Sequence, residues 1–386
     1  MSGTTDTIST PSVVEAPSDR IIVTIPDLFV SFIRHDPAVR KDCEEQKAAS
    51  CQWLSDRLQM DEKATRKLEA GDFTWFAAVY LPHADPQRFR LVSDWTNLIF
   101  YYDDLFDNGL LKSDPVRTRD TVDRLFRAID GDITPADPDT AGLDYVDQVQ
   151  AAHDDFWLRF RALASPSQRR HYRRTMVKFL RGAVQQVQDC SEEYGRSIDE
   201  IMERRRDSVG MDPCFAMICF AYDLDIPDEV LENESIAELE ALCCELGGLQ
   251  NDVVSYRKEE VSQRACSFSP DDFLTSQQEE DVNHNILAVC RMNGMAIQEA
   301  HDYIGDLIGL RIHRMNALID GLPYWGAGVN EQVAMYVQAI KDMIVANVHW
   351  SFRSQRYFGL GNREVRETRV VDLLIEPPYM RRGRGD

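Results

Sequence analysis

The sequence predicts one large all-α domain built as a helical bundle, and three observations carry this prediction. Strands are scarce, since the best candidate, RIIVTIPDLFV from Arg20, is weakened by its proline. No internal repeat and no linker divides the 386 residues. Apolar residues recur at i, i+3, i+4 and i+7 in five long segments. These are LVSDWTNLIFYYDDLFD, HYRRTMVKFLRGAVQQV, ESIAELEALCCELGGLQNDVVSYRKEE, NHNILAVCRMNGMAIQEAHDYIGDLIGLRIHRMNALI and NEQVAMYVQAIKDMIVANVHWSFRSQRYF.

The two ends of the chain differ in composition from the part between them. Residues 1–20 are rich in Ser, Thr and Pro, which predicts a disordered N-terminal tail. The basic run RRGRGD closes the chain, so we expect a flexible C-terminal tail over 377–386. The helical domain is therefore expected to span residues 21–376.

Charge and cysteine usage exclude some classes of partner. The net charge of −22 argues against nucleic acid or an anionic membrane as the main partner, although a local basic pocket remains compatible with a phosphorylated ligand. The nine scattered cysteines form no CxxC pair and are read as reduced core residues. No apolar run reaches the roughly 18 residues of a membrane span, and no secretory signal opens the chain. The expected location is cytoplasmic.

An acidic cluster stands directly behind a hydrophobic run in YYDDLFDNG. A calcium loop is excluded, because counting from Asp103 puts Leu105 third and an asparagine in the sixth place, where glycine is required. A solvated helix end stays open, although carboxylates there oppose the helix dipole. A cation site also stays open, because Asp103 and Asp107 are i and i+4 on one face and Asp104 lies beside Asp107.

A second group of oxygen-bearing residues decides between these readings. In LQNDVVSYRKEE, the residues Asn251, Ser255 and Glu259 fall at i, i+4 and i+8, forming what we call the oxygen ridge. A polar outer face of a helix would look similar. The preceding Gly247 and Gly248 and an apolar stretch indicate instead a face turned inward with room beside it. A buried ridge of three oxygens without a cation would be costly, so a divalent cation is expected there.

With both groups in view, the sequence resembles the class I terpene synthases, particularly the microbial sesquiterpene cyclases. DDLFD and NDVVSYRKE are similar to the paired aspartate-rich and NSE metal motifs of that family. WSFRSQRYF resembles its late RY pair, and ERRRDSVGM resembles its diphosphate-sensor segment. Four motifs in the family order cover residues 103–357, which is far more specific than any one of them.

The resemblance implies a fold with a central active-site cavity and a set of magnesium ligands. Asp103 would bind magnesium from one wall, and the oxygen ridge would bind another ion from the opposite wall. Three Mg²⁺ ions are expected in total. Asp104 and Asp107 would be further ligands or would orient the ligands.

The resemblance also implies the groups that bind the diphosphate. Lys258 would reach it, Arg356 and Tyr357 would clamp it on closure, and Arg205 would sense it, 46 residues before the oxygen ridge begins. Arg205 is chosen over its neighbours Arg204 and Arg206 by the family spacing alone. Ser208 and Val209 would occupy the following linker and effector positions.

The implied reaction is ionisation of an allylic diphosphate, farnesyl diphosphate first, followed by cyclisation to a sesquiterpene hydrocarbon or alcohol. The carbocation needs a closed apolar pocket with aromatic faces. Helical phasing gives aromatic and apolar candidates for the lining of this pocket: Phe73, Phe76, Tyr80, Ile99, Phe100, Phe179, Trp350 and Tyr357. Trp350 is favoured among them because its helical face also carries Tyr357. Ordinary core packing is the competing reading for each aromatic.

Several rival functions are weighed against this one. Chain-elongating prenyltransferases carry two aspartate-rich motifs and coupling enzymes carry paired DxxxD motifs, whereas the second site here is the oxygen ridge. Geranylgeranyl diphosphate remains an alternative substrate, because the sequence does not show the pocket volume. A non-catalytic acidic helical interaction protein would need both oxygen groups to be solvated faces. The oligomeric state stays open, with a homodimer included.

Overall fold

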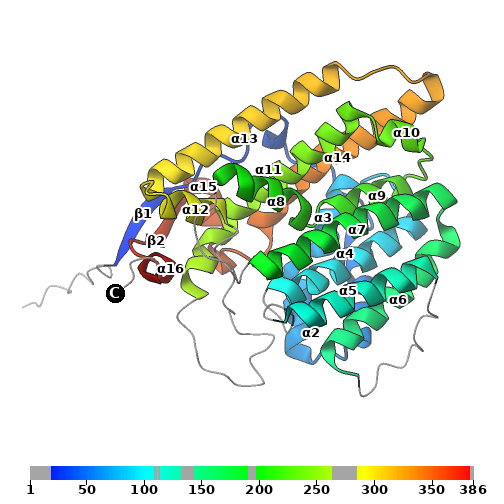
Figure 1. The fold of residues 1–386 in the computed structure, drawn as a ribbon, viewed down its shortest axis with the longest axis horizontal. Helices are drawn as coiled ribbons and strands as arrows, with labels where there is room; N and C mark the ends of the chain where they lie inside the picture. Colours follow the sequence, from blue (N-terminus) through cyan, green and yellow to red (C-terminus); the bar gives the residue numbers. More distant parts are fainter. Residues whose placement is uncertain are drawn as a thin grey trace, which may run out of the picture.

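The computed structural model of the chain describes residues 19–107, 111, 114–131, 143–189, 197–262 and 285–382. Helices dominate it, which confirms the predicted fold class (Figure 1). The helices of the first half are α1 (Cys43–Arg57), α2 (Glu62–Gly71), α3 (Phe73–Tyr80), α4 (Pro86–Asp107), α5 (Pro115–Asp130), α6 (Tyr145–Leu163), α7 (Pro166–Asp189), α8 (Ile198–Ser208) and α9 (Asp212–Ala221).

The second half contributes the longest helices and a short β-ribbon. Its helices are α10 (Asp228–Leu231), α11 (Glu234–Ser262), α12 (Ile286–Met292), α13 (Ile297–Asp320), α14 (Ala327–Arg353), α15 (Asn362–Thr368) and α16 (Pro378–Arg382). The strands are β1 (Arg20–Thr24) and β2 (Val370–Leu374). Among the described residues, the 3₁₀ turns Ser31–Arg34 and Gly359–Gly361 complete the order of elements.

Polar caps fix the start of several helices, as the local sequence requires. Asp61, Asp114 and Asp144 each accept a hydrogen bond from the backbone N–H three residues later. Ser197 and Glu200 form a reciprocal capping box at the start of α8. These caps satisfy backbone donors that the first turn of a helix leaves without intrahelical partners.

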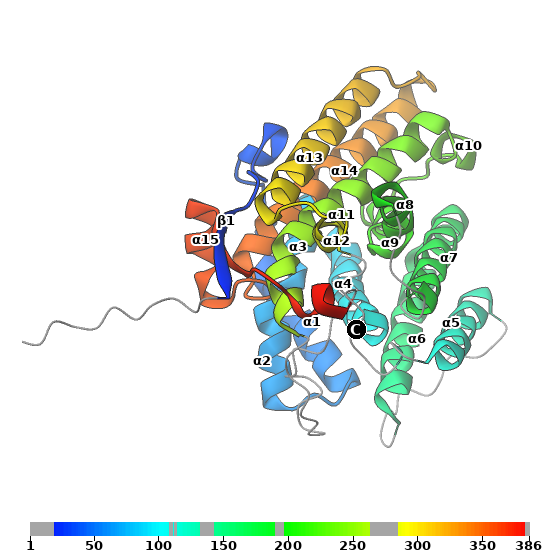
Figure 2. The same cartoon turned by 60° about the vertical axis from the view of Figure 1, so that its left-hand side comes forward.

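The β-ribbon joins the two ends of the described chain. Strand β1 pairs antiparallel with β2, with Arg20 opposite Leu374 and Thr24 opposite Val370. The candidate strand at Arg20 therefore forms, but it ends before the proline, as the missing N–H of proline requires. The ribbon and α16 lie together at one end of the bundle (Figures 1 and 2).

The region expected to be a flexible C-terminal tail contains an ordered element. Residues 378–382 form α16, whose Tyr379 is 1% exposed and meets the hydroxyl of Tyr256 on α11 at 2.6 Å. The sequence missed this contact because a five-residue helix has almost no periodicity to read. The expected N-terminal tail falls largely on residues 1–18, outside the described ranges.

One hydrophobic core runs through the bundle and holds the described cysteines. Those at positions 43, 51, 214, 219, 243, 244 and 290 are free and buried, as expected of reduced core residues. Within the described ranges, no helix is long and apolar enough to cross a membrane. The helices that line the site are α3, α4, α7, α8, α9, α11 and α14, which come together around one pocket.

Candidate active site

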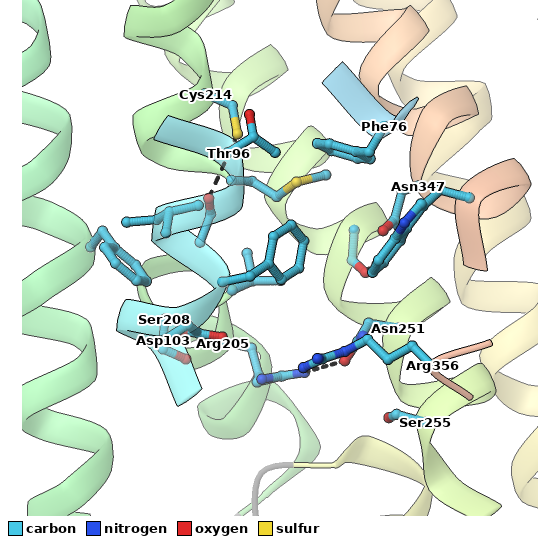
Figure 3. A pocket seen from close by; sticks show the side chains of 18 of the residues that line it. Phe76, Thr96, Asp103, Arg205, Ser208, Cys214, Asn251, Ser255, Asn347 and Arg356 are labelled. Carbon is cyan, nitrogen blue, oxygen red and sulfur yellow. Dashed lines mark hydrogen bonds between the residues drawn. The ribbon is translucent and has the colours of Figure 1, made fainter. Parts of the chain in front are cut away.

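The pocket lies between these helices and has two chemically different ends (Figure 3). In the view of Figure 3 the lower end carries Asp103, Arg205, Asn251, Ser255 and Arg356. The upper end carries Phe76, Thr96, Cys214 and Asn347. The lining also includes Trp95, Ile99, Phe100, Phe179, Ser208, Val209, Gly210, Met211, Gly247, Lys258, Glu259, Trp350 and Tyr357. Charged and strongly polar groups thus gather at one end, and mostly apolar side chains surround the rest.

Three of the predicted motifs meet at Asn251. Its Nδ2 donates a hydrogen bond of 2.9 Å to the Tyr357 hydroxyl, 106 positions later in the chain. Its Oδ1 lies 3.4 Å from a guanidinium nitrogen of Arg205. The segment around Arg205 on α8, the oxygen ridge on α11 and the Arg356-Tyr357 pair after α14 therefore converge on one side chain.

The three consecutive arginines of α8, which the sequence could rank only by the family spacing, have different surroundings in the structure. Arg205 lines the pocket and donates to Asp252 Oδ1 at 2.6 Å. Arg206 turns to Glu245, which also pairs with Arg311 on α13. Arg204 is exposed. Only Arg205 of the three reaches the pocket, which is the arginine that the sequence ranked first.

The oxygen ridge faces the pocket, as its spacing on one helix requires. Asn251, Ser255 and Glu259 all line the cavity, with Lys258 beside them on α11. Asn285, just before α12, donates its Nδ2 to Glu259 Oε2 at 2.7 Å and approaches Ser255 Oγ at 3.5 Å. The alternative of a solvated outer face does not describe Ser255, which is 3% exposed.

The aspartate-rich wall is represented by Asp103. This residue lies on α4 and lines the pocket from the side opposite α11 (Figure 3). The side chains of Asp104 and Asp107 fall outside the described part of the chain. In the part that is described, no three His, Cys, Asp or Glu side chains cluster as a metal-binding group. The candidate ligands are instead divided between two walls, and two of them are an amide and a hydroxyl.

Trp350 organises the aromatic side of the pocket. Its ring lies 5.3 Å from Phe100, 6.0 Å from Phe76 and 5.8 Å from Tyr357, measured between ring centroids. Its indole Nε1 donates to the Gly71 carbonyl at 2.8 Å, which fixes the orientation of the buried ring. The Arg356 guanidinium lies 5.8 Å from the centre of the Phe100 ring, so the polar and aromatic ends meet there.

Not every aromatic candidate reaches the cavity. Phe179 lines it, whereas Phe73 stacks behind Phe100 at 4.1 Å between ring centroids. Tyr80 packs against Phe76 at 5.3 Å and is fully buried. For these two residues, core packing is the reading that the structure supports.

Two glycines are needed where helices approach the pocket. Gly210 has a φ of +75°, which ends α8 and lets α9 start in a new direction, with Ser208 and Val209 on the pocket wall. A Cβ on Gly247 would lie 2.7 Å from the Met211 side chain. The room beside the ridge that Gly247 indicated is thus filled in part by Met211.

Sequence reasoning missed several lining residues that helical phasing from the motifs would have found. Thr96 and Trp95 lie seven and eight positions before Asp103, and Asn347 lies three before Trp350. Each of these falls on the same helical face as the motif residue. Asn285 and Asp252 carried no such signal, because their contacts cross between separate helices.

Burial raises the pKa of two groups around the pocket. Burial raises the pKa of the Asp252 carboxyl, while the Arg205 guanidinium opposes this shift. Burial raises the pKa of the Cys214 thiol to about 12, so the thiol stays neutral at physiological pH. The upper end of the pocket therefore offers no thiolate nucleophile at Cys214.

The donor set fits a hard divalent cation. Amide, hydroxyl and carboxylate oxygens on one face of α11 stand across the cavity from the Asp103 carboxylate, and such oxygens suit magnesium. Arg205, Lys258 and Arg356 add positive charge at the same end, which suits an anionic ligand. The arrangement can therefore hold an anionic group at one end and an apolar body at the other.

The comparisons with known proteins agree with this geometry. Residues 94–314 match the family model described as terpene synthase family 2, C-terminal metal binding. Silphinene synthase peniA of Penicillium patulum is 34% identical over 91% of this chain and 90% of its own length. Sesquiterpene synthase Agr1 of Cyclocybe aegerita is 30% identical over 91% of this chain and 93% of its own. A crystal structure of α-eudesmol synthase shares the fold, with a TM-score of 0.67 at 20% identity, covering 84% of this chain and 99% of that one.

Proposed function

This chain belongs to terpene synthase family 2, and from that membership we propose that it is a magnesium-dependent sesquiterpene cyclase. The proposed substrate is farnesyl diphosphate, and the products are a cyclic sesquiterpene hydrocarbon or alcohol and free diphosphate. The observation that carries the proposal is the meeting of Arg205 and Tyr357 at Asn251, at the oxygen-rich end of an otherwise aromatic pocket.

The polar end accounts for the first step. The allylic C–O bond breaks heterolytically, its electron pair leaves with the diphosphate oxygen, and an allylic cation remains. Bound Mg²⁺ supplies Lewis-acid stabilisation of the negative charge that grows on the leaving group. Arg205, Lys258 and Arg356 donate hydrogen bonds to the same group, and they stabilise it more strongly as its charge develops.

The roles of the individual ligands follow from their positions. We assign Asp103 to one wall of the metal site and the oxygen ridge to the other, with three Mg²⁺ ions in all. Asp104 and Asp107 remain candidates for further ligands on the Asp103 side. Ser208 and Val209, at the break after α8, are assigned the linker and effector positions between Arg205 and the substrate chain.

The aromatic end accounts for the later steps. The cation needs surroundings without water and with negative π-faces, which the rings of Trp350, Phe100 and Phe76 provide. The buried indole of Trp350 is held by Gly71, so its face keeps one orientation during cyclisation. Loss of a proton or capture of water ends the reaction and yields a hydrocarbon or an alcohol.

The choice of farnesyl diphosphate rests on the relatives. The similar protein of Cyclocybe aegerita is named a sesquiterpene synthase, and the match spans nearly the whole of both chains. A C15 product requires a C15 allylic substrate, so farnesyl diphosphate is the proposed substrate. A cytoplasmic location and a homodimer remain predictions.

The decisive experiment is incubation of the purified protein with farnesyl or geranylgeranyl diphosphate, with Mg²⁺ or with a chelator, followed by gas chromatography–mass spectrometry. We expect a cyclic C15 product from farnesyl diphosphate in the presence of Mg²⁺ only. A cyclic C20 product from geranylgeranyl diphosphate alone would make the chain a diterpene cyclase. A longer linear diphosphate formed with isopentenyl diphosphate would assign it to chain elongation. No product, and no thermal shift with Mg²⁺ and diphosphate, would overturn the proposal.

A further inference from the structure

We infer that Asn285 is a positioning residue that orients the Ser255–Glu259 half of the oxygen ridge and connects it to Arg205. The inference rests on the proposed function, since it concerns the same metal site. Asn285 lies in none of the four sequence motifs. It stands 26 positions after Glu259, at the start of the short helix α12.

The side chain of Asn285 has separate tasks for its two polar atoms. Its Oδ1 accepts a hydrogen bond of 2.9 Å from the Leu287 N–H and so caps α12. Its Nδ2 donates to Glu259 Oε2 at 2.7 Å and to the Asp252 carbonyl at 3.0 Å, and it lies 3.5 Å from Ser255 Oγ. Asn285 is 3% exposed, so water does not compete for these bonds.

The next peptide group continues the link to Arg205. The Ile286 N–H donates to Asp252 Oδ2 at 2.9 Å, and Asp252 Oδ1 accepts from Arg205 at 2.6 Å. Asp252 is 1% exposed and follows the first ridge residue directly, so it presents its carboxylate away from the cavity. The start of α12 thus holds Glu259 through a side chain and Arg205 through Asp252.

This arrangement bears on cation binding because ligands must be held in place before the ion arrives. A Glu carboxylate at the end of a flexible side chain loses rotamer freedom when it binds a cation. The Asn285 donor removes part of that freedom in advance while Glu259 still lines the pocket. Loss of such an outer partner commonly weakens metal binding or activity by roughly 10- to 100-fold.

The test is Asn285→Ser, which keeps a cap for α12 but is too short to reach Glu259. The protein is titrated with Mg²⁺ in the presence of inorganic diphosphate, and thermal stabilisation is measured beside turnover. We expect the Mg²⁺ concentration at half-stabilisation to rise about tenfold. The matched control is Asp61→Ser, another cap residue, on α2, whose Mg²⁺ dependence should equal that of the wild type.

A second variant covers the case in which the serine protein does not fold. Asn285→Asp keeps the shape and the cap but places an acceptor against Glu259. Mg²⁺ alone should then raise its melting temperature by more than it raises that of the wild type, because the cation relieves the repulsion between carboxylates.

The outcomes separate this inference from the proposed function. Suppose that the wild type is stabilised by Mg²⁺ and diphosphate, and that both variants show the same Mg²⁺ dependence as the wild type but are less stable at every Mg²⁺ concentration. Asn285 is then only a helix cap, and the inference is overturned. If the wild type itself neither responds nor cyclises a prenyl diphosphate, the proposed function fails first.

Discussion

Glu260 is buried one residue beyond the oxygen ridge, and its replacement by glutamine should change how stability depends on pH. The side chain has no exposed surface, and its oxygens accept the Leu374 N–H of β2 at 2.9 and 3.1 Å. Burial raises its pKa from 4.5 to about 7, although the Leu374 bond and the nearby Arg20 and Arg291 lower it and Asp372 raises it. Glu260 therefore binds a proton more tightly in the folded protein than in the unfolded chain.

The sign and size of the effect follow from this shift. A carboxyl with a raised pKa contributes stability that is complete below about 4.5 and is lost as pH rises through about 7. A pKa raised from 4.5 to about 7 corresponds to a stability contribution of at most roughly 3.4 kcal/mol. Between pH 5.5 and 8.5 the free energy of unfolding should fall by about 2 kcal/mol because of this one group.

The assay compares Glu260→Gln with the wild type by urea unfolding at pH 5.5, 7 and 8.5. Glutamine is neutral throughout and keeps an acceptor for Leu374, so its stability relative to the wild type should rise by about 2 kcal/mol across this range. The control is Glu234→Gln in the exposed first turn of α11, where losing a charge near the helix N-terminus should cost little. Parallel curves for Glu260→Gln and the wild type would refute the reasoning and mean that Glu260 stays ionised beside Arg20.

Three further outcomes are expected. Asn251→Ala should lower turnover of farnesyl diphosphate by at least about 100-fold, because a proposed metal ligand and its contacts to Arg205 and Tyr357 are lost. The helical circular dichroism should stay unchanged. Retained turnover would mean that the oxygen ridge has only a structural role. Trp350→Phe should lower the free energy of unfolding by about 1–3 kcal/mol, because the Gly71 carbonyl loses its donor. It should also change the product mixture seen by gas chromatography. Unchanged stability would show that another donor replaces the indole. A chelator should stop release of diphosphate, measured directly by ion chromatography, and added Mg²⁺ should restore it; release in chelator would remove the metal from the first step.

The fold class and the place of the pocket were predictable because periodic spacing carries them. Helix α11 shows this best, since Asn251, Ser255 and Glu259 repeat every four residues and must share a face whatever the tertiary packing. The same rule places Ile99 one turn before Asp103 on the pocket wall. Such predictions depend only on the geometry of a single helix.

Features that depend on contacts between helices were not predictable in this way. Helical periodicity cannot separate three adjacent arginines on α8. The structure separates them by their partners, because Arg205 meets Asp252 on α11 whereas Arg206 meets Glu245. The strand at Arg20 forms because β2, more than 300 positions later, supplies its partners. The C-terminal helix is held by Tyr379 meeting Tyr256, a contact that neither local sequence indicates.

The face of α11 away from the pocket gives a physical reason why the ends of the chain matter to the site. Tyr256 and Glu260 lie one residue beyond Ser255 and Glu259, so these two ridge residues each have a neighbour that binds α16 or the β-ribbon. Arg291 on α12 donates to the Tyr256 hydroxyl at 2.6 Å and to the Leu374 carbonyl at 3.2 Å, which joins α12 to α11 and to β2. The face of α11 opposite the oxygen ridge is therefore held by the β-ribbon and α16, which lie near the two ends of the described chain. A change that detaches α16 should weaken cation binding before it affects the distant helices α5 and α6.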